Sequence, residues 1–182
     1  GTLVALNELF GKKLDTEALC AVGNKIGADV PLCIKGGTLY SITSGDMITA
    51  ECDTNCVFVC IYPDFTLSTA EAYAKYDENP TEINPHYADF VSSIVCGSLS
   101  EGAGFISNVF TEIYHDSRIE RMKNDLLESG AVISEMTGSG SVVFGVFESE
   151  ETAADAKNIL SGKYPHVFTT RPVNCGVYVL ER

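Results

Sequence analysis

The chain has 182 residues, of which 45% are hydrophobic and 20% charged, as expected for a globular protein of one domain with room for a small second lobe. Its 12 Lys and Arg residues against 25 Asp and Glu residues give a net charge of −13, which disfavours nucleic acids and anionic membrane surfaces as partners. The apolar runs are much shorter than the roughly 20 residues that cross a bilayer. None of the seven cysteines forms a C-x-x-C pair, so we expect reduced thiols in a cytoplasmic protein and no metal site.

The first third of the chain predicts two helices, a hairpin and a strand. Apolar residues at helical spacing predict a helix over 2–10, and a second helix should run from Asp15, which can cap it, to Gly27. Residues 38–49 predict a hairpin around Ser44-Gly45-Asp46. The uninterrupted apolar run Val57–Tyr62 predicts a strand that is buried on both faces.

The remaining residues predict a mixture of helices and strands. Ser68-Thr69-Ala70-Glu71 is a capping box, which marks the start of a helix. The expected helices are 69–77, 86–96, 103–114, 117–129 and 150–160, and the expected strands are 131–136, 142–148, 166–171 and 174–180. This order predicts an α+β domain with helices on one side of a mainly antiparallel sheet.

A fixed aspartate is the first candidate for chemistry. In Gly27-Ala28-Asp29-Val30-Pro31, Pro31 should force residue 30 to be extended, so Asp29 is expected at a turn between a helix and a strand. A carboxylate held rigidly in a cleft can accept a proton from a substrate hydroxyl. Spacing alone favours the alternative that Asp29 bonds only to its own turn.

Two further segments are candidates for binding. The loop Thr137-Gly138-Ser139-Gly140-Ser141 can present successive amides to an anion, although a tight connection between strands explains it equally well. It fits neither the Walker pattern nor G-x-G-x-x-G. Tyr73 follows the capping box and could stack on a base, but packing in the core is the commoner role for such a ring.

Four segments in this order resemble one enzyme family. They are Gly27–Pro31 with Gly36-Gly37, then Ser68–Tyr73, then Met136–Ser141, then Arg171-Pro172-Val173-Asn174-Cys175-Gly176-Val177. Together they are similar to the 4-diphosphocytidyl-2-C-methyl-D-erythritol kinases of the galactokinase, homoserine kinase, mevalonate kinase and phosphomevalonate kinase (GHMP) superfamily. The aspartate turn and the Thr-Gly-Ser-Gly loop are shared across the superfamily, whereas Ser68–Tyr73 and the C-terminal segment point to the narrower family.

The resemblance implies a two-lobed GHMP-kinase fold of the α+β class, with an incomplete N-terminal lobe over 1–50 and a ferredoxin-like C-terminal lobe over 51–182. The Gly/Ser-rich ATP loop and a lysine that accompany the aspartate in the family are absent from this sequence. We therefore expect an N-terminally truncated chain that is inactive by itself. Apolar residues along 2–10 should then be exposed, so we expect self-association, of which a homodimer is one form.

The resemblance also assigns roles to single residues. Asp29 matches the catalytic aspartate, and Gly138, Ser139 and Gly140, with Thr137, match the third superfamily motif near the nucleotide. Tyr73 matches an aromatic position that stacks on the substrate's cytosine, and Thr69 is expected to line the same pocket. ATP and Mg²⁺ would be required, with local positive charge from absent segments or from Lys35 and Lys75.

The activity that the resemblance implies is ATP-dependent phosphorylation of the methylerythritol hydroxyl of 4-diphosphocytidyl-2-C-methyl-D-erythritol, in the non-mevalonate synthesis of isoprenoid precursors. A homoserine-type or mevalonate-type kinase of the same superfamily is the nearer alternative. The alternative of a different class is a non-catalytic ligand-binding domain, which the missing ATP loop favours.

Overall fold

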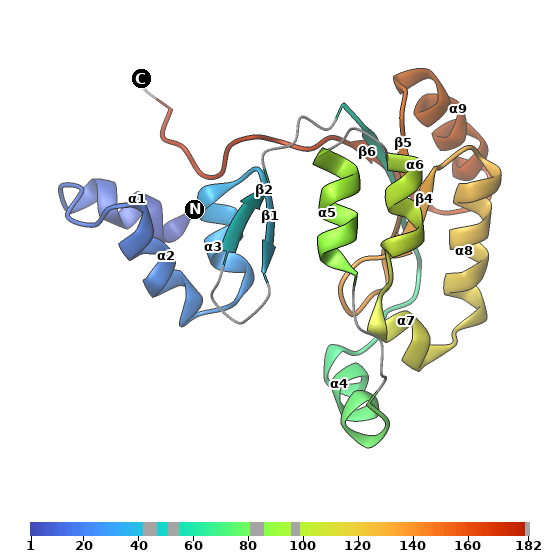
Figure 1. The fold of residues 1–182 in the computed structure, drawn as a ribbon, viewed down its shortest axis with the longest axis horizontal. Coiled ribbons are helices and arrows are strands. Elements are labelled where there is room, and N and C mark those ends of the chain that lie inside the picture. The colour runs from blue at the N-terminus through green and yellow to red at the C-terminus, as the bar shows by residue number, and fades with distance from the viewer. Residues whose placement is uncertain (42–46, 51–54, 81–85, 96–98, 181–182) are drawn as a thin grey trace. The chain divides into compact units, whose positions relative to one another are not determined.

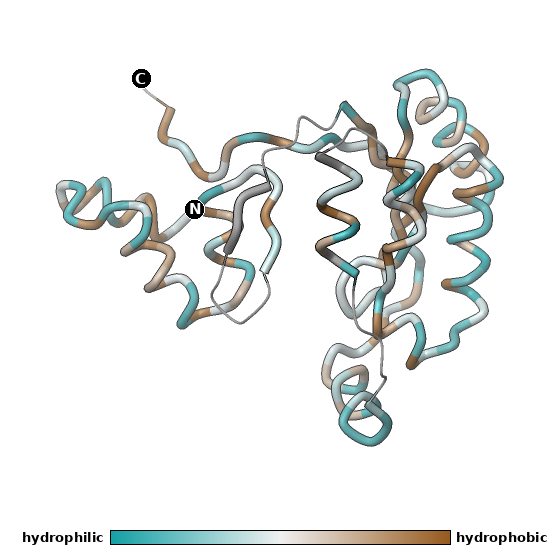
Figure 2. Tube along the Cα trace, in the orientation of Figure 1, coloured by the Kyte–Doolittle hydropathy of each residue, from teal (hydrophilic) through white to brown (hydrophobic). Residues whose placement is uncertain are grey.

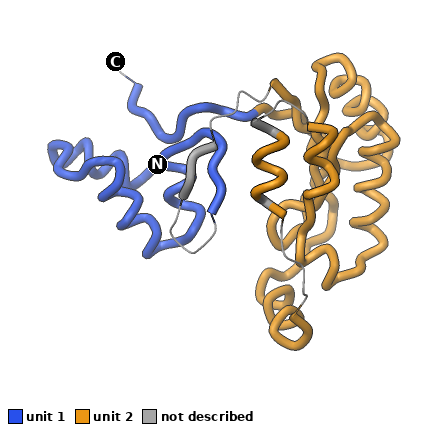
Figure 3. The backbone as a smooth tube through the Cα atoms, viewed as in Figure 1, with its two compact units in different colours: residues 1–52, 172–182 blue, residues 53–171 orange. Residues whose placement is uncertain are grey.

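The computed structural model describes residues 1–41, 47–50, 55–80, 86–95 and 99–180. They form two compact units, one comprising Gly1–Cys52 with Pro172–Arg182 and the other Asp53–Arg171 (Figure 3). Among the described helices, none is long and apolar enough to span a membrane.

The described residues of unit 1 (1–52 and 172–182) form three helices, which share a small core, and a hairpin. The helices are α1 (Thr2–Leu9), α2 (Thr16–Asn24) and α3 (Asp29–Lys35), and the strands are β1 (Thr38–Ser41) and β2 (Met47–Ala50). Asp15 caps α2 as expected, because its carboxylate accepts a hydrogen bond from the amide of Ala18 at 2.8 Å. The antiparallel pairing of β1 with β2 confirms the hairpin, and its expected turn at Ser44-Gly45-Asp46 lies outside the described residues.

The prediction that Asp29 lies at a turn into a strand is wrong. Asp29 is the first residue of helix α3, and Pro31 lies in the first turn of that helix. Backbone amides in the first turn of a helix have no acceptor within that helix, so a proline, which has no N–H, is tolerated at this position. Val30 and Ile34 also pack on α2, and a Cβ at Gly23 would lie 2.7 Å from Val30 Cγ1. This packing outweighs the extended preference of a residue before proline.

The strand expected over 174–180 is also absent from the described structure. Residues 172–180 lie instead against the end of α3. The amide of Val177 donates to the carbonyl of Cys33 at 3.1 Å, and the amide of Gly37 donates to the carbonyl of Val173 at 3.2 Å. A Cβ at Gly176 would lie 2.2 Å from the carbonyl oxygen of Ile34, so the close approach requires glycine. The segment runs beside a helix end, which offers isolated acceptors rather than the repeating ladder of a strand edge.

Unit 2 (53–171) is built on a four-stranded antiparallel sheet. Its strands are β3 (Val57–Tyr62), β4 (Ile133–Met136), β5 (Val143–Phe147) and β6 (His166–Thr170), in the spatial order β4-β5-β3-β6. Helix α8 (Ser117–Glu128) precedes β4, and helix α9 (Glu150–Ser161) connects β5 to β6 (Figure 1). The chain order β3-α8-β4-β5-α9-β6 with this strand order is the ferredoxin-like arrangement, as the resemblance implied.

Helices cover both faces of this sheet, contrary to the expectation of one covered side. On one face α8 and α9 pack on a core that includes Val59, Ile61 and Phe147. On the other face lie α5 (Tyr87–Val95), α6 (Leu99–Gly102) and the short helix η1 (Ala103–Phe105), which pack around Phe58 and Phe144 (Figure 1). The uninterrupted apolar run of β3 requires this second layer, because its alternate side chains point to opposite faces. Figure 2 shows hydrophobic and hydrophilic stretches alternating along α8 as it crosses the sheet.

The helix expected over 103–114 is interrupted. After η1 the chain is extended at Asn108, whose side chain caps a new helix, α7 (Val109–Tyr114). Helix α4 (Thr69–Glu78) begins at Ser68, which accepts a hydrogen bond from the amide of Glu71 as the capping box predicts. Helices α4 and α7 both contribute to the candidate site described below.

A buried carboxylate joins α7, α8 and β4, and it supports a first prediction. Glu135 accepts hydrogen bonds from Thr111 Oγ1 at 2.8 Å and from Lys123 Nζ at 3.0 Å. Lys123→Met would leave this charge without its cation, so we expect the free energy of unfolding to fall by about 2 kcal/mol in urea titrations. Adding Glu135→Gln should recover part of that loss. The control is Lys157→Met, because Lys157 makes no ion pair in the described structure. If Lys123→Met lowered the free energy of unfolding by no more than this control, the prediction would be contradicted.

Candidate functional site

The loop between β4 and β5 is tightly folded and depends on its glycines. The amide of Gly140 donates to the carbonyl of Thr137 at 3.0 Å, and the amide of Thr137 donates to Val142 at 2.9 Å. Gly138 and Gly140 have φ values of +56° and +90°, which glycine adopts readily. A Cβ at Gly140 would lie 2.6 Å from Met136 Sδ and 2.8 Å from Leu67 Cδ1. The conformation of the loop therefore excludes a side chain at Gly140.

Two amides of this loop are available to a ligand. In the described structure the backbone N–H groups of Gly138 and Ser139 donate to no protein acceptor. A Cβ at Gly138 would meet no atom within 4 Å, so the space around this residue is open. Adjacent unpaired amides in a loop with a left-handed residue can bind an anionic oxygen. The geometry thus fits the anion-binding interpretation of the sequence.

Helix α4 presents two predicted binding residues beside this loop. Thr69 Oγ1 lies 2.8 Å from Ser139 Oγ, within hydrogen-bond distance, across 70 positions of sequence. Tyr73 lies one turn further along the same face of α4, because residues four apart in a helix are neighbours. Its side chain is 56% exposed, and its ring meets that of Phe110 edge to face with centroids 5.1 Å apart. Tyr73 is therefore not a core residue, and its ring remains accessible.

Helix α7 holds the loop and α4 together, and sequence reasoning missed its role. Asn108 Nδ2 donates to the carbonyls of Met136 at 2.7 Å and Gly138 at 2.8 Å, while its Oδ1 accepts from the amide of Phe110 at 2.9 Å. At the other end of the helix the hydroxyl of Tyr114 donates to the carbonyl of Ser68 at 2.9 Å. An Asn directly before an apolar run is a capping signal, and it could have identified this helix start.

The electrostatics of this region come from few groups. Burial, with a smaller effect of Glu71, raises the pKa of Tyr114, so its hydroxyl stays protonated and remains a donor at neutral pH. Lys75 lies over the Tyr114 ring, with Nζ 4.9 Å from the centroid, and supplies a positive charge on α4. Lys35, the other lysine expected to supply charge, pairs with Glu17 at 3.0 Å in unit 1.

Asp29 lies in unit 1, whereas the other predicted site residues belong to unit 2. It is exposed and occupies the first turn of α3, where the helix dipole favours a negative charge. The carboxylate of Asp29 lies on a short helix whose first turn is made rigid by Pro31, and such a group can act as a proton acceptor. The structure thus brings together Thr69, Tyr73 and Thr137–Gly140 within unit 2, and it positions Asp29 on a separate element.

The residues present fit a phosphate better than a protein-held metal. Among the described residues there is no group of three His, Cys, Asp or Glu side chains that could hold a metal ion. The unpaired amides of Gly138 and Ser139 suit a phosphoryl oxygen. A divalent cation would then be held chiefly by the phosphates of a nucleotide, which is common for Mg²⁺.

The position of Asn108 supports a second prediction. Asn108→Ala removes two hydrogen bonds to carbonyls and one helix cap, so we expect a loss of about 2–3 kcal/mol of stability. The amides of Thr137 and Gly140, which donate hydrogen bonds within the loop, should also exchange faster with deuterium, because the loop loses the bond that anchors the carbonyl of Gly138. Urea unfolding and hydrogen exchange measure the two effects. Asn124→Ala, at an exposed asparagine of α8, is the matched control, and equal effects from both variants would contradict the assignment.

Comparison with known proteins identifies relatives over nearly the whole chain. Residues 108–166, all within unit 2, match the family described as GHMP kinases C terminal. The 4-diphosphocytidyl-2-C-methyl-D-erythritol kinase of Caldanaerobacter subterraneus subsp. tengcongensis is 32% identical over 181 residues, which cover 98% of this chain and 63% of that protein. The enzyme of the same name from Lachnoclostridium phytofermentans is 37% identical over 160 residues, 85% of this chain and 54% of that protein. The chain therefore spans about three fifths of the length of the curated relatives that it matches.

Solved structures show the same fold. A homoserine kinase from Cytophaga hutchinsonii superposes with a TM-score of 0.80 at 16% identity, over 94% of this chain and 62% of that one. A 4-(cytidine 5'-diphospho)-2C-methyl-D-erythritol kinase superposes with a TM-score of 0.71 at 18% identity, over 91% of this chain and 60% of that one. These likenesses establish an α+β GHMP-kinase fold. Together with the sequence relatives, they identify the chain as a homologue of the 4-diphosphocytidyl-2-C-methyl-D-erythritol kinases, within the GHMP kinase superfamily.

Proposed function

We propose that this chain, in a protein of its relatives' full length, phosphorylates the methylerythritol hydroxyl of 4-diphosphocytidyl-2-C-methyl-D-erythritol with ATP. This reaction is a step in the synthesis of isoprenoid precursors. The observation that carries the proposal is the contact of 2.8 Å between Thr69 Oγ1 and Ser139 Oγ. It joins the segment that distinguishes the cytidylated-substrate kinases to the loop that all GHMP kinases share.

The proposed roles are those that the resemblance to the family implies, and the chemistry of each residue suits its role. Asp29 accepts the proton of the substrate hydroxyl while the hydroxyl oxygen attacks the γ-phosphorus and the bond to ADP breaks. The amides of Gly138 and Ser139, in the loop Thr137–Gly140, bind a phosphoryl oxygen. Tyr73 stacks on the cytosine, and Thr69 lines the same pocket. Residues 1–50 are assigned to the N-terminal lobe and residues 51–182 to the C-terminal lobe, although 172–182 fall in the same compact unit as 1–52.

The nucleotide and its cation are part of this proposal. ATP supplies the phosphoryl group, and Mg²⁺ accompanies its phosphates. Phosphoryl transfer depends mainly on positioning and on neutralising charge, so a loop and a base together are only part of a catalytic site. Segments that the longer relatives possess would complete it.

Two alternatives remain as outcomes of the test. Homoserine and mevalonate kinases share the fold, but their substrates offer no base to stack on the exposed ring of Tyr73. A non-catalytic ligand-binding domain would use the loop without turnover. The exposed Tyr73 beside the loop favours the cytidylated substrate over both.

The test is ADP release by a chain extended at its N-terminus to the length of its relatives. It is given ATP, Mg²⁺ and, in separate reactions, the cytidylated methylerythritol, homoserine or mevalonate. Turnover with the cytidylated substrate alone is the expected result. Turnover with homoserine or mevalonate instead would assign the alternative kinase, and turnover with none would favour the binding domain.

A further inference from the structure

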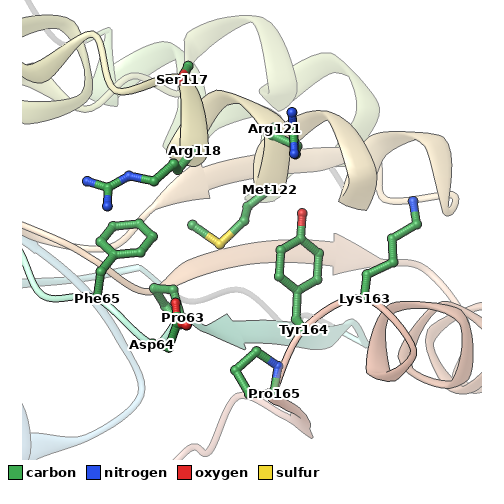
Figure 4. Close-up of a pocket in the computed structure, with 10 residues that line it drawn as sticks. All are labelled: Pro63, Asp64, Phe65, Ser117, Arg118, Arg121, Met122, Lys163, Tyr164 and Pro165. Carbon is green, nitrogen blue, oxygen red and sulfur yellow. The ribbon is translucent and has the colours of Figure 1, made fainter.

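A cavity in unit 2 is lined by different residues from those of the candidate site. Its volume is about 330 Å³, at the lower end of the roughly 300–1,000 Å³ that is usual for small-molecule sites. Three segments line it: residues 63–65 after β3, the first two turns of α8, and residues 163–165 between α9 and β6 (Figure 4). None of Asp29, Thr69, Tyr73 or the loop Thr137–Gly140 contributes to it.

The floor of this cavity is apolar. In Figure 4 the sulfur of Met122 lies between the rings of Phe65 and Tyr164, with the ring of Pro63 beside Phe65 and that of Pro165 below Tyr164. Met122 is polarisable, and the two rings offer flat faces. Such a surface suits the planar or apolar body of a small organic molecule.

The rim carries three cations, which is unusual in a chain with a net charge of −13. The guanidinium of Arg118 lies over the Phe65 ring, 3.8 Å from its centroid, and bonds Asp116 through Nε at 3.0 Å and Nη2 at 2.6 Å. Lys163 Nζ bonds Asp125 Oδ1 at 2.8 Å. Both pairs leave further N–H groups unused, because a guanidinium has five and an ammonium three.

Arg121 is the cation that has no direct partner, although its charge acts on the nearby Asp125 and helps to lower the pKa of that carboxyl. Within the described part of the chain it makes no hydrogen bond or ion pair, although it lines the cavity. The nearby carboxylate of Asp125 is already engaged by Lys163 and, through its other oxygen, by the Tyr164 hydroxyl at 2.5 Å. Asp64 is the carboxylate that lines the cavity itself, and it is exposed to solvent. A guanidinium that makes no hydrogen bond to the protein can bind a phosphate through paired N–H···O bonds.

We propose that this cavity binds a small organic phosphate. Its phosphoryl group is held by Arg121, while Arg118 and Lys163, which lie at opposite ends of the cavity (Figure 4), add positive charge around it. Its planar or apolar body lies on Phe65 and Tyr164, with the buried Met122 between them. The proposal is independent of the kinase activity, because it uses none of the residues assigned to that reaction.

The test uses phenyl phosphate as the probe and methionine methyl NMR on the intact 182-residue chain. The chain has three methionines, so the spectrum is simple. Met122 lines this cavity, whereas Met136 adjoins Gly140 of the loop, so the two methyl groups report on different sites. We expect saturable shifts that are largest at Met122, and roughly tenfold weaker binding of both inorganic phosphate and phenol, which each lack one half of the interaction.

Two variants of equal charge separate specific binding from general attraction. Arg121→Gln should weaken phenyl phosphate binding by roughly fivefold or more, whereas Lys157→Gln, on α9 outside the cavity, should leave it unchanged. An equal loss of affinity for phenyl phosphate in both variants would overturn the proposal. It would also be overturned if phenol bound as tightly as phenyl phosphate. Shifts confined to Met136, or the absence of any shift, would overturn it as well, without affecting the proposed kinase activity.

Discussion

In a chain extended at its N-terminus to the length of its relatives, Asp29→Asn should lower kcat with the cytidylated substrate about a thousandfold and leave the fold intact. Asparagine has nearly the shape of aspartate, but it cannot accept the proton of the attacking hydroxyl at neutral pH. The carboxylate of Asp29 is exposed and makes no hydrogen bond or ion pair within the described residues, so its replacement should cost little stability. Steady-state kinetics and circular dichroism measure the two properties.

The control for this variant is Glu17→Gln, which also removes one exposed carboxylate from unit 1 and breaks the ion pair with Lys35. It should leave kcat within about twofold, because exposed pairs contribute little. Turnover by Asp29→Asn that equals that of Glu17→Gln would remove Asp29 from the reaction. A shift of KM with unchanged kcat would assign it to substrate binding instead.

Local sequence signals predicted most of the elements in this fold. Caps at Asp15 and Ser68 mark helix starts that the structure confirms, because a cap depends only on a few neighbouring residues. The apolar run of β3 likewise identified a central strand. Where the expectation failed, tertiary packing decided: Val30 is helical because α3 packs on α2 at Gly23.

The candidate site is only partly visible in the sequence, since its contacts join distant segments. Thr69 and Ser139 are 70 positions apart, and Asn108 reaches Gly138 across 30. No spacing rule connects such pairs, so the residues could be proposed one by one but not their mutual arrangement. The resemblance supplied their order along the chain, whereas the bonds of Asn108 and Tyr114 emerge only from the folded unit.

Tyr73→Ala should raise the KM for the cytidylated substrate by roughly 10–100-fold and change kcat less, since stacking on a base contributes about 1–3 kcal/mol. The edge-to-face contact with Phe110 holds the Tyr73 ring while more than half of its side chain stays exposed. A ring so held loses little entropy when a base stacks on it. Tyr73→Phe keeps the ring and should stay within about twofold of the parent KM.

The control for the stacking role is Tyr178→Ala, which removes a similarly exposed tyrosine from unit 1 and should leave both KM values unchanged. If Tyr73→Ala raised the KM for ATP and spared the cytidylated substrate, the ring would belong to the nucleotide side of the site. If neither KM changed, α4 would carry no substrate contact at this position, and the assignment of Thr69 on the same helix face would lose its support. The pattern of the two KM values therefore tests the substrate class separately from the phosphoryl transfer that Asp29 tests.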